Sequence, residues 1–343
     1  MLNKIIVMQF RYLGDAVFIT PSLYAIHSQF PNSELHVLVA EDIAPIFENL
    51  PFINKAWAIP RSRGQANLWA NLPIINRLRK EKYDISIDLG GNDRGAILSL
   101  LINAKVRIGP VKEKFSFLKK ISYNKAFSLK NAVDTWVKRN LDLVTLGLGI
   151  KVDEIPRLNI KSSALLSNDA KKIISGYKII CHIGTSQEKK EWPIKKWLHL
   201  YQLAKQMGYA IAFSAGPGER EQKLLHAIKE LDASIFTLPA SLDLSVFLAI
   251  LNEVELVISG DTGPLHLASG LGKKVIGLFA VEDGVKHYAP IYAKNEVIIG
   301  KPCTCTGDLV HFSACQSASP CMSSISAEQV FELLKERYPL NAP

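Results

Sequence analysis

The 343-residue chain is predicted to be an α/β protein with two doubly wound, Rossmann-like domains facing a central cleft. Short apolar, β-branched runs alternate with helical stretches in both halves, which is typical of parallel sheets covered by helices. This alternation is interrupted at about 151–176, and the length suits two domains. We expect one Rossmann-like domain at 1–160, a second at 161–325 and, at 326–343, a helix that packs back across both.

The first half of the chain contains five strand-like runs separated by helical patterns. The strands are expected at 4–10, 34–39, 53–59, 82–91 and 104–109, and the helices at 16–30, 40–50, 66–81 and 93–103. Pro21 falls in the second turn of the first helix, where it either kinks the helix or ends a short first turn. Residues 110–140 are less regular and mix seven lysines with aromatic residues. They form either a basic surface facing an acidic acceptor or a membrane, or a solvated amphipathic face.

The second half repeats the same alternation. Its strands are expected at 177–184, 209–216, 233–238, 254–259 and 274–279, and its helices at 193–208, 218–231, 242–253, 265–272 and 326–338. The carboxyl ends of parallel strands meet at one edge of a sheet, so the turns after successive strands are expected to converge there. The ligand site is therefore predicted in a cleft between the two domains.

The composition restricts the class of partner. Lys and Arg outnumber Asp and Glu by 41 to 32, giving a net charge of +9. This excess favours anionic partners, although no recognised nucleic-acid-binding module accompanies it. We expect no signal peptide and no membrane span, because the apolar runs are short. The protein is therefore predicted to be cytoplasmic, with contact at a membrane surface allowed.

The most informative stretch is 254–279, which reads as strand, tight turn, helix and strand. Gly260 and Gly263 allow close backbone approach, and Asp261 or Thr262 can cap the helix. The start of such a helix offers N–H groups and a positive dipole end to an anion such as a phosphate. The alternative is a well-capped helix without a ligand.

Other polar residues are predicted at the same edge. Thr185 and Ser186 offer hydroxyl groups and Lys190 a mobile cation, all suited to a diphosphate. Glu219 begins a helix, where its carboxylate could hold a ribose or simply cap the helix. His266 lies near the start of the helix after Gly263, where the dipole disfavours protonation.

In the first half, Asp15 lies where the first strand passes into a helix. A carboxylate near a helix N-terminus is stabilised in its ionised form, which a general base requires. The alternative is an N-cap that serves only the helix.

Several motifs together resemble a known family. RYLGD with TPSL, then HIG and KKEWP, GPGERE and SGDTGPLHLASGLGKKVIGLF occur in this order over nearly the whole chain. They resemble glycosyltransferase family 9, the ADP-heptose:lipopolysaccharide heptosyltransferases. The amino-terminal half is most similar to the branch that adds the third heptose of the inner core.

This resemblance implies a GT-B fold and an inverting transfer of heptose from ADP-heptose to the lipopolysaccharide inner core, at the inner face of the inner membrane. It implies that the domain at 1–160 binds the acceptor, that the domain at 161–325 binds the nucleotide-sugar donor, and that Asp15 is the general base. It implies donor contacts by Thr185, Ser186, Lys190, Glu219, Asp261, Thr262, Gly263 and His266, and no metal or other cofactor.

Two features depart from the family pattern. After the strand at 274–279 the chain has AVEDG where the family usually has a Gly-Pro-Thr-type turn. Cys303, Cys305, Cys315 and Cys321 are crowded near the end of the chain and could hold zinc or iron. A metal-holding or scaffold protein therefore stays open, as do a nucleotide-sugar epimerase and a transferase that adds heptose to protein.

Overall fold

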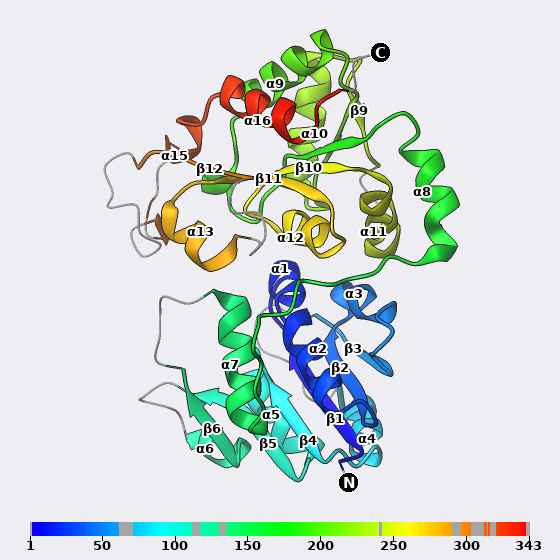
Figure 1. The fold of residues 1–343 in the computed structure, drawn as a ribbon, viewed down its shortest axis with the longest axis vertical. Coiled ribbons are helices and arrows are strands. Elements are labelled where there is room, and N and C mark those ends of the chain that lie inside the picture. Colours follow the sequence, from blue (N-terminus) through cyan, green and yellow to red (C-terminus); the bar gives the residue numbers. More distant parts are fainter. Residues whose placement is uncertain are drawn as a thin grey trace. The chain divides into compact units, whose positions relative to one another are not determined.

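The computed structural model describes residues 2–61, 71–111, 117–129, 135–239, 242–289, 296–302, 312–313, 315 and 320–340. The chain divides into two compact units, Met1–Lys161 and Ser162–Pro343. Each unit contains one parallel six-stranded sheet (Figure 1). We refer to them as unit 1 and unit 2.

The sheet of unit 1 has the strand order β3-β2-β1-β4-β5-β6. Its strands are β1 (Lys4–Gln9), β2 (Glu34–Ala40), β3 (Lys55–Ile59), β4 (Ile85–Asp88), β5 (Val106–Val111) and β6 (Lys125–Ser128). Its helices are α1 (Leu13–Val17), α2 (Thr20–Gln29), η1 (Glu41–Ile43), α3 (Pro45–Glu48), α4 (Leu72–Lys80), α5 (Asp93–Ile102), α6 (Phe117–Ser122) and α7 (Trp136–Leu148). Because β1 is central and covered on both sides, its sequence is almost continuously apolar.

The helix expected at 16–30 is two helices, α1 and α2, separated at Phe18 and Ile19. Pro21 lies in the first turn of α2, where its missing N–H costs no hydrogen bond. The buried Thr20 hydroxyl donates to the Val17 carbonyl at 2.8 Å and stabilises this break. Of the two alternatives for Pro21, the structure shows the second: a short first helix ends before it.

The sheet of unit 2 has the order β12-β11-β10-β7-β8-β9. Its strands are β7 (Ile179–His182), β8 (Ile211–Ser214), β9 (Phe236–Thr237), β10 (Leu256–Gly260), β11 (Lys274–Phe279) and β12 (Val297–Ile299). Its helices are η3 (Ala164–Leu166), α8 (Ser167–Ile173), η4 (Glu188–Lys190), α9 (Ile194–Gln206), α10 (Glu219–Leu231), α11 (Leu244–Glu253), α12 (Gly263–Gly270), α13 (Glu282–Tyr288), α15 (Pro320–Ser323) and α16 (Ala327–Arg337). Figure 1 shows α9, α10 and α16 on one face of the sheet and α11 and α12 on the other.

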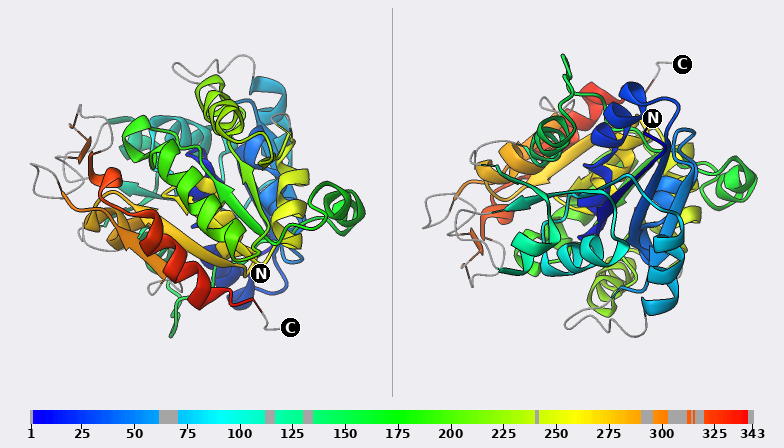
Figure 2. Two further views of the ribbon diagram at one scale, coloured as in Figure 1. Left: turned by 90° about the horizontal axis from the view of Figure 1, so that it is seen from above. Right: turned by 90° about the horizontal axis from the view of Figure 1, so that it is seen from below.

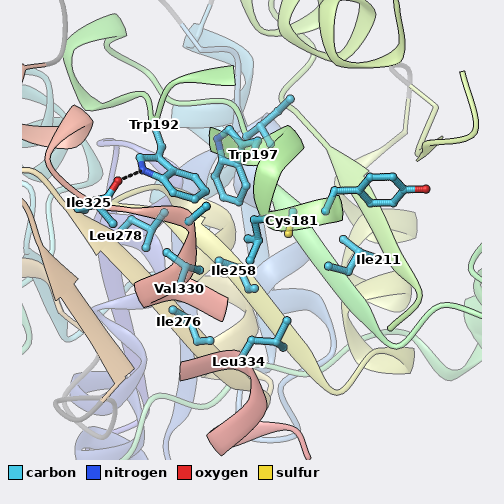
Figure 3. Packing of buried hydrophobic residues seen from close by; sticks show 14 of the residues in the cluster. Cys181, Trp192, Trp197, Ile211, Ile258, Ile276, Leu278, Ile325, Val330 and Leu334 are labelled. Atoms are coloured by element: carbon cyan, nitrogen blue, oxygen red, sulfur yellow. Dashed lines mark hydrogen bonds between the residues drawn. The ribbon is translucent and has the colours of Figure 1, made fainter. Parts of the chain in front are cut away.

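The core of unit 2 joins segments from both ends of the unit. Trp192 and Trp197 pack edge to face, with ring centroids 4.7 Å apart, over buried residues of the sheet. The Trp192 indole N–H donates to the Ile325 carbonyl at 3.1 Å, and Val330 and Leu334 of α16 complete the cluster (Figure 3). Helix α16 packs on α9 and β11 of this unit, and Figure 2 shows it beside α9.

The predicted α/β class with two doubly wound sheets is confirmed, whereas several elements differ from the expectation. Helices α6 and α7 and strand β6 lie in or next to the lysine-rich stretch where no regular element was predicted, and α8 lies in the expected crossing. Helix α13 and strand β12 follow the predicted elements of unit 2. No helix in the described residues has the length and apolarity needed to cross a membrane.

Candidate active site

In unit 1, Asp15 is the third residue of α1, the helix that follows β1 after a three-residue turn. Its Oδ2 accepts a hydrogen bond from the Tyr12 backbone N–H at 3.2 Å. The Asp15 carboxylate therefore forms a hydrogen bond within its own turn, and its side chain is half-buried. The sequence prediction placed it at the start of a helix, and the structure locates it there.

Three arginines lie around this turn at the carboxyl edge of the sheet. Arg61 donates through both terminal nitrogens to the Arg11 carbonyl at 3.2 Å and pairs with Asp42 at 2.5 Å. Arg94 donates to the Pro60 carbonyl at 2.8 Å. Burial, together with the nearby Arg61 charge, lowers the pKa of Arg94 from its usual value. Sequence reasoning did not single out Arg61 or Arg94, although each follows a predicted strand.

The Arg11 side chain is fixed from two sides. Its Nε donates to the Gly90 carbonyl at 3.1 Å, and its guanidinium lies 4.8 Å from the centre of the Trp136 ring. The turn at Gly90 is itself held by Asp88, whose Oδ1 accepts the Gly90 N–H at 2.9 Å. Tyr123 donates to the other Asp88 oxygen at 2.6 Å. A buried carboxylate thus organises the turn that positions Arg11.

In unit 2, the turn after β7 meets the turn after β10. Gly260 faces the Thr185 side chain and the Lys190 carbonyl, each 3.4 Å from the position of a Cβ at residue 260. Glycine therefore permits this close approach. Thr185 is buried and donates to the Gln187 carbonyl at 2.6 Å, whereas Ser186 is exposed. The structure thus brings the Thr185 and Lys190 segment next to the Asp261 turn.

Asp261 connects a lysine and a histidine. Its Oδ2 accepts a hydrogen bond from the Lys190 ammonium at 2.6 Å, and its Oδ1 lies 3.6 Å from Nε2 of the buried His266. Burial alone would raise the pKa of Asp261, but His266 and the Lys190 charge outweigh it and hold this pKa below its usual value. The ionised carboxylate and the ammonium form an ion pair beside α12.

Helix α12 begins at Gly263, with Thr262 as its N-cap residue and Pro264 in its first turn. The Thr262 hydroxyl lies 3.0 Å from the Ser259 hydroxyl, and its side chain makes no capping hydrogen bond to the helix. The first-turn N–H groups are therefore not satisfied by their own cap residue. This arrangement suits an incoming anion better than the well-capped alternative does.

Two carboxylates of α10 differ in their surroundings. Glu219, the predicted ribose contact, has a side chain that is 86% exposed and pairs with Lys223 at 2.8 Å. Glu221 lies against Gly184 and Gly216, in the turns after β7 and β8. Burial raises the pKa of Glu221. The role of Glu219 stays a prediction, and Glu221 is a second candidate that sequence reasoning missed.

Further contacts extend the cluster around Lys190. Arg220 donates to the Glu191 carboxylate and to the Thr185 carbonyl, so it ties the start of α10 to the turn after β7. A small recess next to Lys190 and Asp261 is lined by residues 278–281, Gly284 and Phe312. The AVEDG segment thus contributes to the recess. Nothing in the local sequence around Phe312 indicated this position.

The cysteine cluster is only partly described. Cys321 is buried and Cys315 half-buried, whereas Cys303 and Cys305 lie outside the described residues. Within the described part of the chain, no group of three or more His, Cys, Asp or Glu side chains could hold a metal ion. The expected metal independence stays a prediction.

Two parallel α/β units with polar clusters at the carboxyl ends of their strands agree with the GT-B class of fold. The family model for glycosyltransferase family 9 (heptosyltransferase) matches residues 72–317, so the chain belongs to this family. The chain is therefore a glycosyltransferase, as predicted.

Relatives and solved structures agree with this assignment. Lipopolysaccharide heptosyltransferase 1 of Campylobacter coli is 25% identical, and the match covers 98% of this chain and 99% of that protein. The crystal structure of a family 9 glycosyl transferase from Veillonella parvula superposes with a TM-score of 0.84 at 20% identity, covering 97% of this chain and 96% of that chain. The structure of Escherichia coli ADP-heptose lipopolysaccharide heptosyltransferase II gives 0.78 at 17% identity, covering 97% and 98%.

Proposed function

We propose that this enzyme transfers heptose from ADP-heptose to an inner-core lipopolysaccharide acceptor, with inversion at the anomeric carbon. The observation that carries the proposal is the cluster of Lys190, Asp261 and His266 beside the start of α12. Such a cluster suits a diphosphate leaving group. The names of the Campylobacter and Escherichia proteins support the choice of sugar and acceptor.

In this proposal, unit 2 binds the donor. The bond between the heptose anomeric carbon and the β-phosphate oxygen breaks, and negative charge develops on the ADP that leaves. Lys190 and the N–H groups at Gly263 stabilise that charge, with hydroxyl contacts from Thr185, Ser186 and Thr262. Lys190 is paired with Asp261, so it would exchange this carboxylate for the diphosphate when the donor binds. Asp261 would then be available to the heptose hydroxyls.

Unit 1 binds the acceptor in this proposal. Arg11, Arg61 and Arg94 present three guanidinium groups near the turn that bears Asp15. Guanidinium groups bind carboxylates and phosphates well, so this edge suits an acidic saccharide. The proposal places the reaction at the cytoplasmic face of the membrane. The third inner-core heptose remains the branch predicted from the sequence.

Asp15 is proposed as the general base. The acceptor hydroxyl oxygen attacks the anomeric carbon, and its proton passes to the Asp15 carboxylate as ADP departs. A single displacement of this kind inverts the anomeric configuration. It requires the central cleft predicted from the sequence, with Asp15 reaching the donor held by unit 2.

The experiment is to incubate the purified protein with ADP-heptose and a panel of truncated lipopolysaccharide cores, and to determine product masses. Asp15→Ala is expected to slow transfer about 10²–10⁴-fold while ADP binding stays nearly unchanged. Lys190→Ala is expected to weaken ADP binding and also to lower the transfer rate by about 10²-fold.

Two exposed residues provide matched controls. Glu48→Gln removes another carboxylate of unit 1, and Lys195→Ala removes a lysine from the exposed start of α9. Both variants should transfer heptose at the wild-type rate. Near-normal turnover by Asp15→Ala would refute the assignment of the base. Conversion of ADP-heptose to an isomer without any acceptor would instead identify an epimerase.

A further inference from the structure

We propose that the outward face of α6 in unit 1 docks on the surface of an anionic lipid bilayer. Two large apolar side chains project from this helix. Phe117 is 76% exposed and Ile121 is 44% exposed. They are four residues apart and therefore lie on one face of the helix, one turn from each other. Neighbouring exposed apolar side chains, unlike single ones, can mark a surface that binds a membrane or a partner.

The opposite face of α6 is firmly held. The helix packs on α5, and Ser122 and Tyr123 are buried. The Lys119 ammonium donates to the Gly91 carbonyl at 2.7 Å. Tyr123 donates to the buried Asp88 at 2.6 Å. These contacts fix the orientation of the helix, so Phe117 and Ile121 point outward because of the fold and not because the segment lacks packing.

Within the described segment 117–129, the charged side chains are all lysines. Residues 117–129 contain three lysines and no Asp or Glu. Lys120 is exposed on α6 itself. Lys125 is exposed at the start of β6, the strand at the edge of the sheet (Figure 1), and its ammonium donates to the Gly147 carbonyl at 3.3 Å. Cations beside projecting apolar side chains are typical of surfaces that bind acidic lipid headgroups.

The size of the feature favours a bilayer over a protein partner. A helix of six residues is about 9 Å long. A stable protein interface buries about 800 Å² on each partner, which two side chains do not supply. Two apolar side chains can instead insert among lipid headgroups, and lysines add electrostatic attraction. The attachment is therefore expected to be weak and reversible.

The proposed docking surface is separate from the proposed transfer reaction, but docking would place that reaction at a membrane. Lys119 joins α6 to the Gly90–Gly91 turn, which also holds Arg11 at the proposed acceptor edge. Docking through α6 would thus keep that edge near acceptors that are anchored in lipid. The docking itself requires neither ADP-heptose nor lipopolysaccharide.

The test is co-sedimentation of the full-length protein with vesicles of phosphatidylcholine, with and without phosphatidylglycerol, and with no lipopolysaccharide present. The wild type should bind only the anionic vesicles, and salt should weaken the binding. The double variant Phe117→Ser, Ile121→Ser should lose about tenfold or more in binding. Leu165→Ser is the control, because Leu165 is 91% exposed in unit 2.

A second measurement detects insertion directly. Phe117→Trp should be quenched by lipids with brominated acyl chains more strongly than the wild type is. The double serine variant should still transfer heptose to a detergent-solubilised acceptor at the wild-type rate. Absence of vesicle binding by the wild type, or equal binding by the double variant, would overturn the proposal. Because no donor or acceptor is present, that result would leave the proposed transfer reaction unaffected.

Discussion

At the scale of single residues, the two glutamates in the first turn of α10 have different surroundings. Glu219 begins the helix and extends into solvent, whereas the Glu221 carboxylate lies in the space left by two glycines. A Cβ at Gly184 or Gly216 would overlap that carboxylate. Glycine at both positions thus preserves a place for a carboxylate at the edge where the nucleotide is proposed to bind.

We therefore predict that Glu221→Gln weakens ADP binding about tenfold or more, because a hydrogen bond to a charged acceptor contributes about 1.5–3 kcal/mol. Glu219→Gln, two residues away, is the matched control and should bind ADP nearly as the wild type does. Isothermal titration calorimetry measures both affinities. The reverse ranking would favour Glu219, the residue indicated by the sequence.

At the scale of elements, α16 stabilises the segment that carries the proposed phosphate-binding lysine. A capping box begins the helix, with Gln329 N–H donating to the Ser326 hydroxyl at 3.1 Å and the Gln329 side chain accepting the Ser326 N–H at 2.9 Å. Just before it, Trp192 and Lys196 donate to the Ile325 carbonyl at 3.1 and 2.6 Å. The chain around Lys190 is thus supported by a helix more than a hundred residues later.

Truncation of Leu334 tests this support. Leu334 is fully buried in the core of unit 2, so Leu334→Ala should lower the free energy of unfolding by about 2–5 kcal/mol through lost burial and a residual cavity. Leu231→Ala is the control, because Leu231 is 51% exposed at the end of α10. Its effect should stay within about 0.5 kcal/mol. Urea unfolding measures the free energy of unfolding of both variants. A loss for Leu334→Ala as small as the loss for Leu231→Ala would show that α16 contributes little to the core.

At the scale of the whole molecule, the fold class could be predicted because buried parallel strands leave a clear apolar pattern. Strand β6 escaped prediction because it is short, lies at the sheet edge and exposes most of its residues. Helix α7 did carry a readable signal, with Thr135 capping it and Gly149 ending it in a left-handed conformation. The lysine-rich composition before it concealed that signal.

The candidate site, like the fold, could be predicted only in part from the sequence. Asp15, Lys190 and Asp261 could be proposed from the sequence because they follow predicted strands within short polar motifs, and the structure pairs Lys190 with Asp261. The sequence could not distinguish Glu221 from Glu219, because both lie in one motif. They differ in the burial of their side chains, which depends on how α10 packs. Phe312 reaches the recess through contacts distant in sequence. Local pattern locates the turns, whereas packing selects the side chains that line the site.

The acid stability of the protein should depend on His182. Burial lowers its pKa to about 3 from the ordinary value of 6.5, and its Nδ1 lies 3.0 Å from the Ser214 hydroxyl. Between these two pKa values the unfolded chain binds a proton that the folded protein does not. The free energy of unfolding should therefore fall as pH decreases through this window, by up to about 1.4 kcal/mol per pH unit from this group.

His182→Gln removes the titration while retaining a polar side chain beside Ser214. We expect its urea midpoint to decrease less steeply with falling pH than that of the wild type. His36, whose pKa is also lowered by burial, is present in both proteins and cancels in the comparison. Identical slopes for the two proteins would exclude His182 as the titrating group.

The dependence of the Trp192 segment on Ile325 and α16 has a consequence during synthesis. On the ribosome, the central strands of unit 2 emerge well before the residues that complete their core. The hydrogen bonds from Trp192 and Lys196 to the Ile325 carbonyl can form only after Ile325 has left the exit tunnel. Unit 2 of a nascent chain is therefore expected to complete its core only after residues 325–334 have been synthesised, and chains stalled before residue 325 should be substrates for chaperones and proteases.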